Sequence, residues 1–229
     1  MTTRQSVKER GPAPRIVAVI ASPADLRVAM RMRMPPDLFE IRLDHFCGHL
    51  DQLETKMSIL RAPLIITARH PREGGANNLS IEQRRELLSR FLSRASYVDV
   101  ELRDVSSFRS LLDLARREKV RRIMSFHDFG STPTVRSLRT KARDAKSRGA
   151  DIFKVATRTD TPDQLARLFD FVANKGVDLA VSAMGIGKLG AISRFVLACC
   201  GSALNYASLG ASKIEGQLSI QQLRSALGR

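Results

Sequence analysis

Short apolar runs rich in Val and Ile recur along the chain, separated by stretches whose apolar residues repeat at helical spacing. Each run is five or six residues long, which suits a strand that is buried in a parallel sheet. The runs cover residues 16–21, 38–43, 64–68, 97–102, 122–126, 152–156, 178–183 and 204–208. The pattern predicts eight strands that alternate with helices.

Two of the intervening stretches show where a helix begins. Ser80, with Gln83 three residues later, forms a capping-box pattern. Thr161 precedes Pro162, a residue favoured at the first helical position, and Gly176 predicts the end of that helix. The residues predicted to form the apolar faces are Leu87, Leu88, Phe91 and Leu92 in the first helix and Leu165, Leu168, Phe169 and Val172 in the second.

Eight strands alternating with helices favour a (β/α)8 barrel, and 229 residues suit one such domain, predicted over residues 16–229. A doubly wound open sheet is the alternative. It would commonly carry a Gly-x-Gly-x-x-Gly turn after the first strand to bind a nucleotide, but residues 22–25 read Ser-Pro-Ala-Asp.

The chain is strongly basic, with a formal net charge of +15. Such a charge suits a nucleic-acid partner or an anionic small substrate. Lys and Arg are spread along the whole chain, and two Tyr without any Trp supply few platforms for stacking bases. We therefore expect a solvated basic surface and a small anionic substrate, with neither a nucleic acid nor a membrane as partner.

The remaining composition points to a reducing compartment. Cys47, Cys199 and Cys200 form no disulfide framework and no zinc pattern, so we expect a cytoplasmic protein without a metal. Residues 1–15 contain charged residues and prolines but no apolar core of a secretory signal. They are predicted to form a flexible basic tail.

Polar and charged residues interrupt several predicted strands or directly follow them. In a barrel, the C-terminal ends of the strands form the face that carries active sites. The residues at these positions include Glu40, Arg42, Asp44, Thr67, Arg69, Asp99, Glu101, Ser125, His127, Lys154, Ser182 and Met184. They form either a reactive site or a buried polar network that only holds the barrel interior together.

Lys154 interrupts the otherwise apolar strand at residues 152–156. Burial favours the neutral amine, which is the form that attacks a ketone. The alternative is a structural lysine paired with a buried carboxylate such as Glu101. His127 closes the preceding strand, where its imidazole would lie beside Lys154 and could move protons.

Two loop regions could complete such a site. Glu73 precedes two glycines in the loop at residues 69–75, where it could orient a histidine or simply face solvent. Arg194 follows a glycine-rich turn at residues 185–190. The turn could cradle a phosphate through its N–H groups, or Arg194 could bind a carboxylate through two parallel hydrogen bonds.

Taken in order, several short motifs resemble those of type I 3-dehydroquinate dehydratases, a family of class I aldolase-like barrels. The resemblance runs from about residue 16 to residue 219. The matching segments are 40–44 (EIRLD), 67–69 (TAR), 73–75 (EGG), 98–102 (VDVEL), 125–129 (SFHDF), 151–156 (DIFKVA), 184–185 (MG), 192–194 (ISR) and 216–217 (GQ).

The resemblance implies a role for each matching residue. Lys154 corresponds to the imine-forming lysine, His127 to the general acid and base, and Glu73 to the carboxylate that pairs with this histidine. Arg194 corresponds to the arginine that binds the substrate carboxylate. The other matching residues, which contact substrate hydroxyls, order the pocket or form its wall, are Glu40, Arg42, Arg69, Met184 and Gln217.

The implied activity is the dehydration of 3-dehydroquinate to 3-dehydroshikimate in the shikimate pathway, without a cofactor and in a possible homodimer. One departure concerns the last loop, which commonly reads Ser-Ala-Pro-Gly-Gln in the family but Lys213-Ile-Glu-Gly-Gln217 here. Another Schiff-base aldolase, a nucleic-acid-binding module and an inactive barrel are the competing hypotheses. An aldolase of sugar phosphates would need a phosphate cradle on the last strands.

Overall fold

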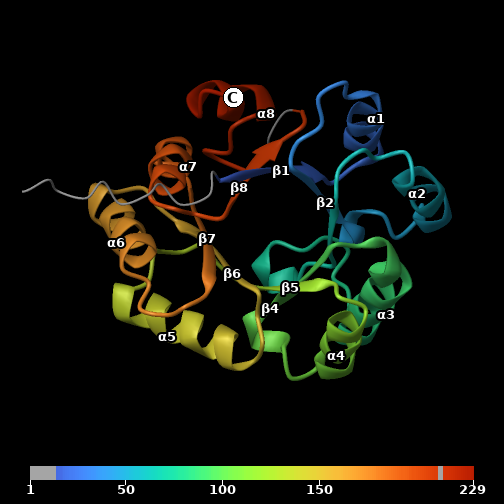
Figure 1. Ribbon diagram of the computed structural model, residues 1–229, viewed down its shortest axis with the longest axis horizontal. Coiled ribbons are helices and arrows are strands. Elements are labelled where there is room, and N and C mark those ends of the chain that lie inside the picture. Colours follow the sequence, from blue (N-terminus) through green and yellow to red (C-terminus); the bar gives the residue numbers. More distant parts are fainter. Residues whose placement is uncertain (1–13, 211–213) are drawn as a thin grey trace, which may run out of the picture.

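The computed structural model describes residues 14–210 and 214–229, and it confirms the predicted (β/α)8 barrel. All neighbouring strands pair in parallel, in the order β7-β6-β5-β4-β3-β2-β1-β8. Figure 1 shows the helices as a ring around the strands. Residues 1–13 of the predicted tail lie outside the described residues. Arg15, which was also assigned to the tail, is instead the first residue of β1.

The strands are β1 (Arg15–Ile20), β2 (Leu38–Arg42), β3 (Leu64–Thr67), β4 (Tyr97–Glu101), β5 (Arg121–Asp128), β6 (Ile152–Arg158), β7 (Ala180–Ile186) and β8 (Leu204–Ser208). The α-helices are α1 (Pro23–Arg31), α2 (Leu50–Met57), α3 (Ile81–Phe91), α4 (Arg109–Arg117), α5 (Val135–Ser147), α6 (Pro162–Ala173), α7 (Gly190–Cys199) and α8 (Ile220–Ala226). Short 3-10 turns are η1 (Leu43–His45), η2 (Pro71–Glu73), η3 (Leu92–Arg94) and η4 (Leu102–Asp104).

The barrel closes between β7 and β8. The backbone N–H of Ala203 donates to the carbonyl of Val181 at 2.8 Å, and the Ser182 hydroxyl donates to the carbonyl of Leu204 at 2.8 Å. A side-chain hydroxyl therefore supplies part of the pairing at this seam. Closure leaves no open crevice of the kind in which doubly wound sheets bind nucleotides.

Three strands extend further than their apolar runs predicted. β5 remains paired as far as Asp128, β6 as far as Arg158 and β7 as far as Ile186, whereas the predicted ends were residues 126, 156 and 183. The predicted start of β7 at residue 178 was two residues too early. In β5 and β6 the pairing continues through polar residues, so hydrophobicity alone misplaced these ends, and in β7 it continues past Gly185 to Ile186.

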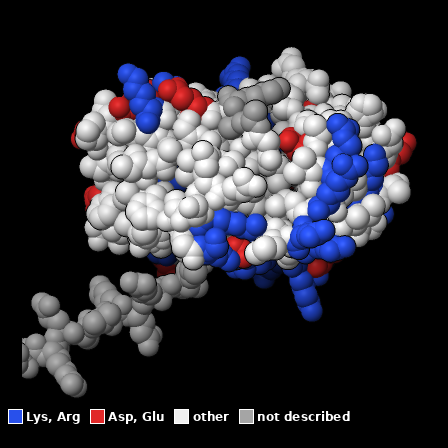
Figure 2. Space-filling view, turned by 90° about the horizontal axis from the view of Figure 1, so that it is seen from above, with Lys and Arg blue, Asp and Glu red and all other residues white. Residues whose placement is uncertain are grey.

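The surface charge is dispersed on the face shown in Figure 2. Lys and Arg gather there in a few separate groups with wide uncharged areas between them. The groups do not join into one basic face of the kind that a nucleic-acid backbone requires. Within the described part of the chain, no helix is long and apolar enough to cross a membrane.

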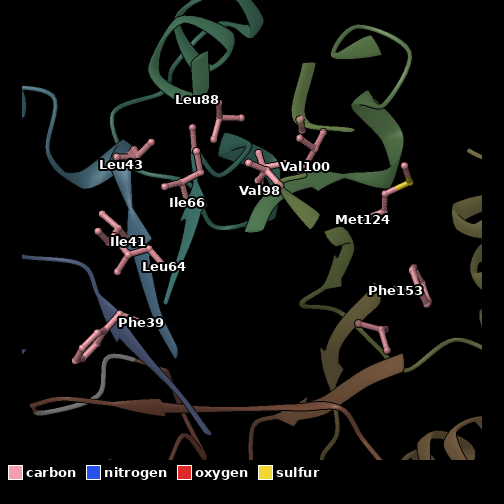
Figure 3. Packing of buried hydrophobic residues seen from close by; sticks show 14 of the residues in the cluster. Phe39, Ile41, Leu43, Leu64, Ile66, Leu88, Val98, Val100, Met124 and Phe153 are labelled. Atoms are coloured by element: carbon pink, nitrogen blue, oxygen red, sulfur yellow. The ribbon is translucent and has the colours of Figure 1, made fainter. Parts of the chain in front are cut away.

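Apolar side chains fill two regions. Outward-facing strand residues such as Phe39, Ile41 and Ile66 pack against the helices, and Figure 3 shows Leu88 of α3 reaching toward Ile66. A second cluster fills the barrel itself around Val17, Leu38, Ile65, Ile123 and Tyr206. The barrel is thus a packed core below its active face rather than a pore.

The predicted helix signals hold with one exception. The capping box of Ser80 and Gln83 is present, and a second joins Thr161 to Gln164. Phe169, however, was assigned to the buried face of its helix and is 45% exposed, while Phe171 is buried instead. The barrel wall contacts a stripe of α6 centred on Leu168, Phe171 and Val172, which leaves Phe169 on the outer surface.

Candidate active site

A cavity of about 410 Å³ lies at the C-terminal ends of the strands. It is lined by side chains from most of the strands and the loops that follow them. The nine residues singled out in the sequence all line it: Glu40, Arg42, Arg69, Glu73, His127, Lys154, Met184, Arg194 and Gln217. The fold therefore brings together residues that are up to 177 positions apart, since Glu40 and Gln217 are the first and last of them.

Lys154 lies at the base of this cavity and is 3% exposed. Its Nζ donates to Glu40 Oε1 at 3.1 Å and to Asp99 Oδ2 at 3.0 Å. The proposed alternative pairing with Glu101 is wrong, because Glu101 accepts hydrogen bonds from Arg69 and Arg84. The two carboxylates hold the amine across the barrel, with its nitrogen facing the cavity.

Arg69 links the carboxylates beneath Lys154 into one network. Its guanidinium donates to Asp99 Oδ2 at 3.0 Å, to Glu101 Oε1 at 2.9 Å and to the Ser125 hydroxyl at 2.6 Å. It is 2% exposed, so these are interactions of a desolvated cation. Burial alone would lower the pKa of Arg69, but the neighbouring carboxylates raise it well above its ordinary value.

Asp99 is the carboxylate shared by both cations. Burial alone would raise the pKa of Asp99, but Arg69 and Lys154 hold it well below its ordinary range. Asp99 is therefore a fixed negative charge rather than a proton carrier. Its role is to balance the positive charges of its neighbours.

His127 pairs with Glu73, which the sequence placed on a glycine-containing loop. Glu73 Oε2 lies 2.9 Å from His127 Nδ1 and also accepts the His127 backbone N–H at 3.0 Å. When Glu73 is ionised, its carboxylate oxygen at Nδ1 assigns the ring proton to that nitrogen. Nε2 is then the nitrogen with the free lone pair that can accept a proton.

Burial tunes both members of this pair. It lowers the pKa of His127 well below the ordinary value, and the nearby charges of Arg69 and Lys154 lower it further. Burial raises the pKa of Glu73 to about 7, with a further contribution from the charge of Glu101. His127 is thus a neutral imidazole near neutral pH, as a general base must be.

Asp44 holds the loop that carries Glu73, although the sequence analysis did not assign it to the site. It is fully buried and accepts two hydrogen bonds from Arg42 and one each from the backbone N–H groups of Arg69 and Ala76. Arg42 also donates to the carbonyl of Gly74 at 2.8 Å. This cluster fixes η2 over the cavity and so aims Glu73 at His127.

Arg194 is held differently from the other buried cations. It is 2% exposed, and its guanidinium donates to the carbonyls of Gly185, Gly190, Tyr206 and Gly216 at 2.8–3.2 Å. No ion pair joins it to an acid in the described part of the chain. Burial lowers the pKa of Arg194 to about 10, so it remains a cation at neutral pH.

These contacts show what the glycine-rich turn does within the protein. The turn presents carbonyl oxygens, rather than N–H groups, to Arg194, so it holds the arginine. The last loop also passes close to the backbone of this turn at Gly216. Only glycine fits there, because φ is +76° and a Cβ would lie 2.4 Å from the Gly187 carbonyl oxygen. This close packing brings the last loop, with Gln217, to the cavity.

The unusual last loop has its own anchor. Glu215, which stands where the family commonly has proline, lies 3.1 Å from Arg158 NH1, and its carbonyl accepts the Gly187 N–H at 3.0 Å. An ion pair and a backbone hydrogen bond therefore hold this segment. Lys213, part of the same departure, lies outside the described residues.

Sequence reasoning noted Asp99, Glu101 and Ser125 at strand positions but did not assign them to the site. It missed Tyr206 altogether, whose ring lies 4.1 Å from Lys154 Nζ. A polar residue inside an apolar strand was the available signal for the first three. Tyr206 gives no such signal, because an aromatic residue is ordinary in a buried strand.

The fold and the cavity together define a (β/α)8 barrel with a buried amine at the centre of its candidate active site. A family model described as "Type I 3-dehydroquinase" matches residues 18–228. A 3-dehydroquinate dehydratase from Shouchella clausii is 34% identical over 207 residues, covering 84% of this chain and 80% of its own length. One from Pyrococcus abyssi is 33% identical over 198 residues, covering 83% and 86%.

A solved structure agrees with these matches. The 3-dehydroquinate dehydratase of Geobacillus kaustophilus superposes with a TM-score of 0.86 at 29% identity, covering 95% of this chain and 91% of that one. The chain belongs to the type I 3-dehydroquinase family. It is therefore a hydro-lyase, and the resemblance read from its motifs is confirmed.

Glu73 should make the folded protein less stable as the pH rises. Its pKa is about 7 in the folded state and near 4.5 once exposed, so the folded state holds a proton that the unfolded state has lost between these values. We expect Glu73→Gln to raise the free energy of unfolding by up to about 3 kcal/mol at about pH 8 and by little near pH 5.

Chemical denaturation across this pH range measures the effect, with Glu86→Gln on the exposed face of α3 as the matched control. A stability difference for Glu73→Gln that does not change with pH would contradict the buried, proton-holding carboxyl.

Proposed function

We propose that the protein dehydrates 3-dehydroquinate to 3-dehydroshikimate through an imine on Lys154, as a step of the shikimate pathway. The observation that carries this proposal is that one cavity is lined by both a buried amine and a buried cation that pairs with no acid among the described residues. Lys154 suits a ketone and Arg194 suits a carboxylate, and 3-dehydroquinate has both groups. A sugar phosphate would lack the carboxylate.

Arg194 binds the substrate carboxylate through N–H groups that its backbone carbonyl partners leave unused. This site can take an anion at low cost because the arginine is already desolvated and fixed. Glu40, Arg42 and Arg69 contact substrate hydroxyls or order the pocket. Met184 forms an apolar wall, and Gln217 contacts the substrate from the last loop.

Imine formation begins with loss of a proton from the Lys154 ammonium, because only the neutral amine is a nucleophile. Glu40 lies 3.1 Å from Nζ and can receive this proton, whereas the low pKa of Asp99 makes it a poor acceptor. Nζ then bonds to the ketone carbon, and the carbonyl oxygen leaves as water. The protonated imine withdraws electrons from the neighbouring carbon.

His127 carries out the proton transfers that follow. Its Nε2 removes the proton from the carbon next to the imine, while Glu73 holds the ring through Nδ1. The resulting enamine expels the hydroxyl group, which takes the proton back from His127 and leaves as water. Attack by water on the conjugated imine then releases the product and regenerates the amine.

Cytoplasmic localisation and a homodimer belong to the same proposal. The outer surfaces of the neighbouring helices α6 and α7 support the dimer, because three large apolar side chains are exposed there. Phe169 is 45%, Ile192 52% and Phe195 42% exposed. Large apolar side chains exposed on neighbouring helices are typical of a face that a partner covers.

The imine can be trapped directly. Incubation with 3-dehydroquinate and borohydride should add the mass of the reduced ligand to the intact protein, because hydride converts the imine to a stable amine. Lys154→Ala should show no adduct and should lose several powers of ten in turnover, on the order of 10⁴-fold or more.

His127→Ala provides the matched comparison, since it should still form the adduct while its turnover falls by about 10²–10⁴-fold. An adduct on another lysine, or normal turnover by the His127 variant, would sink this mechanism.

The carboxylate clamp predicts a binding defect. Arg194→Gln should raise KM by about 10–100-fold, because a charge-assisted hydrogen bond to the substrate is lost. Arg194→Lys should recover only part of this loss, since an ammonium cannot make two parallel bonds.

Steady-state kinetics measures both variants, with melting temperatures to establish that they fold. Lys188→Gln, an exposed residue of the same turn, is the control. An unchanged KM in a folded Arg194→Gln protein would place the carboxylate elsewhere.

The dimer is tested by sedimentation velocity. Phe195→Asp should convert the dimer to a monomer, because it places a charge in the apolar contact, whereas Val28→Asp on the exposed surface of α1 should leave the dimer intact. A protein that already sediments as a monomer without substitution would refute the dimer.

A further inference from the structure

Tyr206 lies inside the barrel and contacts both Lys154 and Arg194, the two cations on which the proposed function depends. It is 3% exposed, and its ring centroid is 4.1 Å from Lys154 Nζ. Its backbone carbonyl accepts a hydrogen bond from Arg194 Nε at 3.2 Å. The lysine nitrogen therefore has three neighbours: the carboxylates of Glu40 and Asp99, and the face of an aromatic ring.

The hydroxyl of Tyr206 does not account for this placement. Among the described residues, it is the one buried side-chain polar atom without a hydrogen-bond partner. Burial, together with the charges of Glu40 and Asp99, raises the pKa of Tyr206 well above its ordinary value, so the phenol stays neutral. The part of Tyr206 that has a partner is its ring.

The ring contact differs from the two hydrogen bonds in what happens to it during the reaction. An ammonium has three N–H donors. When Nζ bonds to the ketone carbon and water leaves, a protonated imine retains one N–H. It can then donate to only one of Glu40 and Asp99. Attraction to a ring face needs no donor hydrogen, so it persists while the nitrogen stays charged.

The other groups that face Nζ have opposing effects on its positive charge. Glu40 from β2 and Asp99 from β4 favour a positive nitrogen, while Arg69, which follows β3, opposes it. His127 from β5 is neutral near neutral pH. The adjacent inward side chains of β1 and β7, Val19, Ser182 and Met184, carry no charge.

We propose that the face of the Tyr206 ring keeps the Lys154 imine protonated, and so preserves the electron-withdrawing form that the reaction requires. This inference rests on the proposed function. The contact should favour the protonated over the neutral imine by about tenfold, the upper part of the range for a desolvated cation over an aromatic ring. Losing this contact should let the imine nitrogen give up its proton at a pH about one unit lower.

Ring fluorination tests the proposal without removing the ring. Tyr206→Phe is the reference, since it deletes a hydroxyl without a protein partner. Phenylalanines with one, two and three ring fluorines are then incorporated at position 206. Each fluorine withdraws electron density from the ring face at nearly constant shape, which weakens the attraction to a cation.

Two readouts follow the charge on the imine. The first is the alkaline limb of kcat, and the second is the pH dependence of adduct formation with cyanoborohydride, which reduces the protonated imine. We expect both to move to lower pH in the order of fluorine number, by about one unit for three fluorines, with little change at lower pH. Limbs that stay in place in folded variants would overturn the proposal.

Tyr97 offers a matched control inside the same barrel. Its ring also lies near cations, 5.4 Å from the guanidinium carbons of Arg15 and Arg121, but at the opposite end of the strands. The same fluorine series at position 97 should leave both limbs unchanged, and a shift there equal to that at position 206 would also overturn the proposal.

The outcome also separates this inference from the proposed function. If the unsubstituted protein forms no adduct on Lys154, the proposed function fails and the role of Tyr206 fails with it. If it forms the adduct but fluorination has no effect, only the role of Tyr206 is wrong.

Discussion

The buried ion network around Arg69 is the constraint on which the rest of the active face depends. Three cations, Arg69, Arg84 and Lys154, meet four carboxylates within the barrel and just beside it, all of them shielded from water. The carboxylates are Glu40, Asp99, Glu101 and Asp104. Removing one member of such a network leaves a buried charge without a partner, which costs about 3–5 kcal/mol.

This network explains how the buried Lys154 amine is accommodated inside the barrel. Glu40 and Asp99 give the Lys154 amine the hydrogen-bond partners that burial removed with the water. Burial lowers the pKa of His127, and Arg69 and Lys154 lower it further because they disfavour a second positive charge nearby. A neutral base beside a carboxylate-bound amine thus follows from burial together with this set of charges.

Arg194 stands outside this network and is prepared in the opposite way. Backbone carbonyls supply partial negative charge but no full counterion, so the guanidinium is fixed and desolvated without being neutralised. The surroundings of Lys154 and of Arg194 therefore differ in whether the positive group has an acidic partner. The amine is paired with carboxylates, whereas the guanidinium has only carbonyl partners among the described residues, which suits the proposed keto-acid substrate.

The sequence determined the strand count and the alternation, because buried parallel strands leave a strong apolar signal. It also located the nine cavity residues, mainly through the order of motifs shared with a family, which individual strand positions could not reveal. Strand ends were misplaced where pairing continues through polar residues, as at Thr157 and Arg158. Phe169 was misplaced because helical spacing does not show how wide a stripe the barrel covers.

Pairings across the barrel were beyond the sequence. From the sequence, Glu101 was named as the alternative partner of Lys154, although Asp99 lies on the same face of that strand. Only the register and the barrel diameter place Asp99 under Nζ and turn Glu101 toward Arg84. The contact of Tyr206 with Nζ depends on the same geometry, because β8 and β6 are not neighbours in the sheet.

The central claim is that one bound substrate contacts both the Lys154 amine and the Arg194 guanidinium. A crystal structure of the protein after borohydride treatment with 3-dehydroquinate tests it most directly. The account predicts continuous density from Lys154 Nζ to the ligand ring, with the ligand carboxylate on the Arg194 guanidinium. Density on another lysine, or a carboxylate bound away from Arg194, would contradict it.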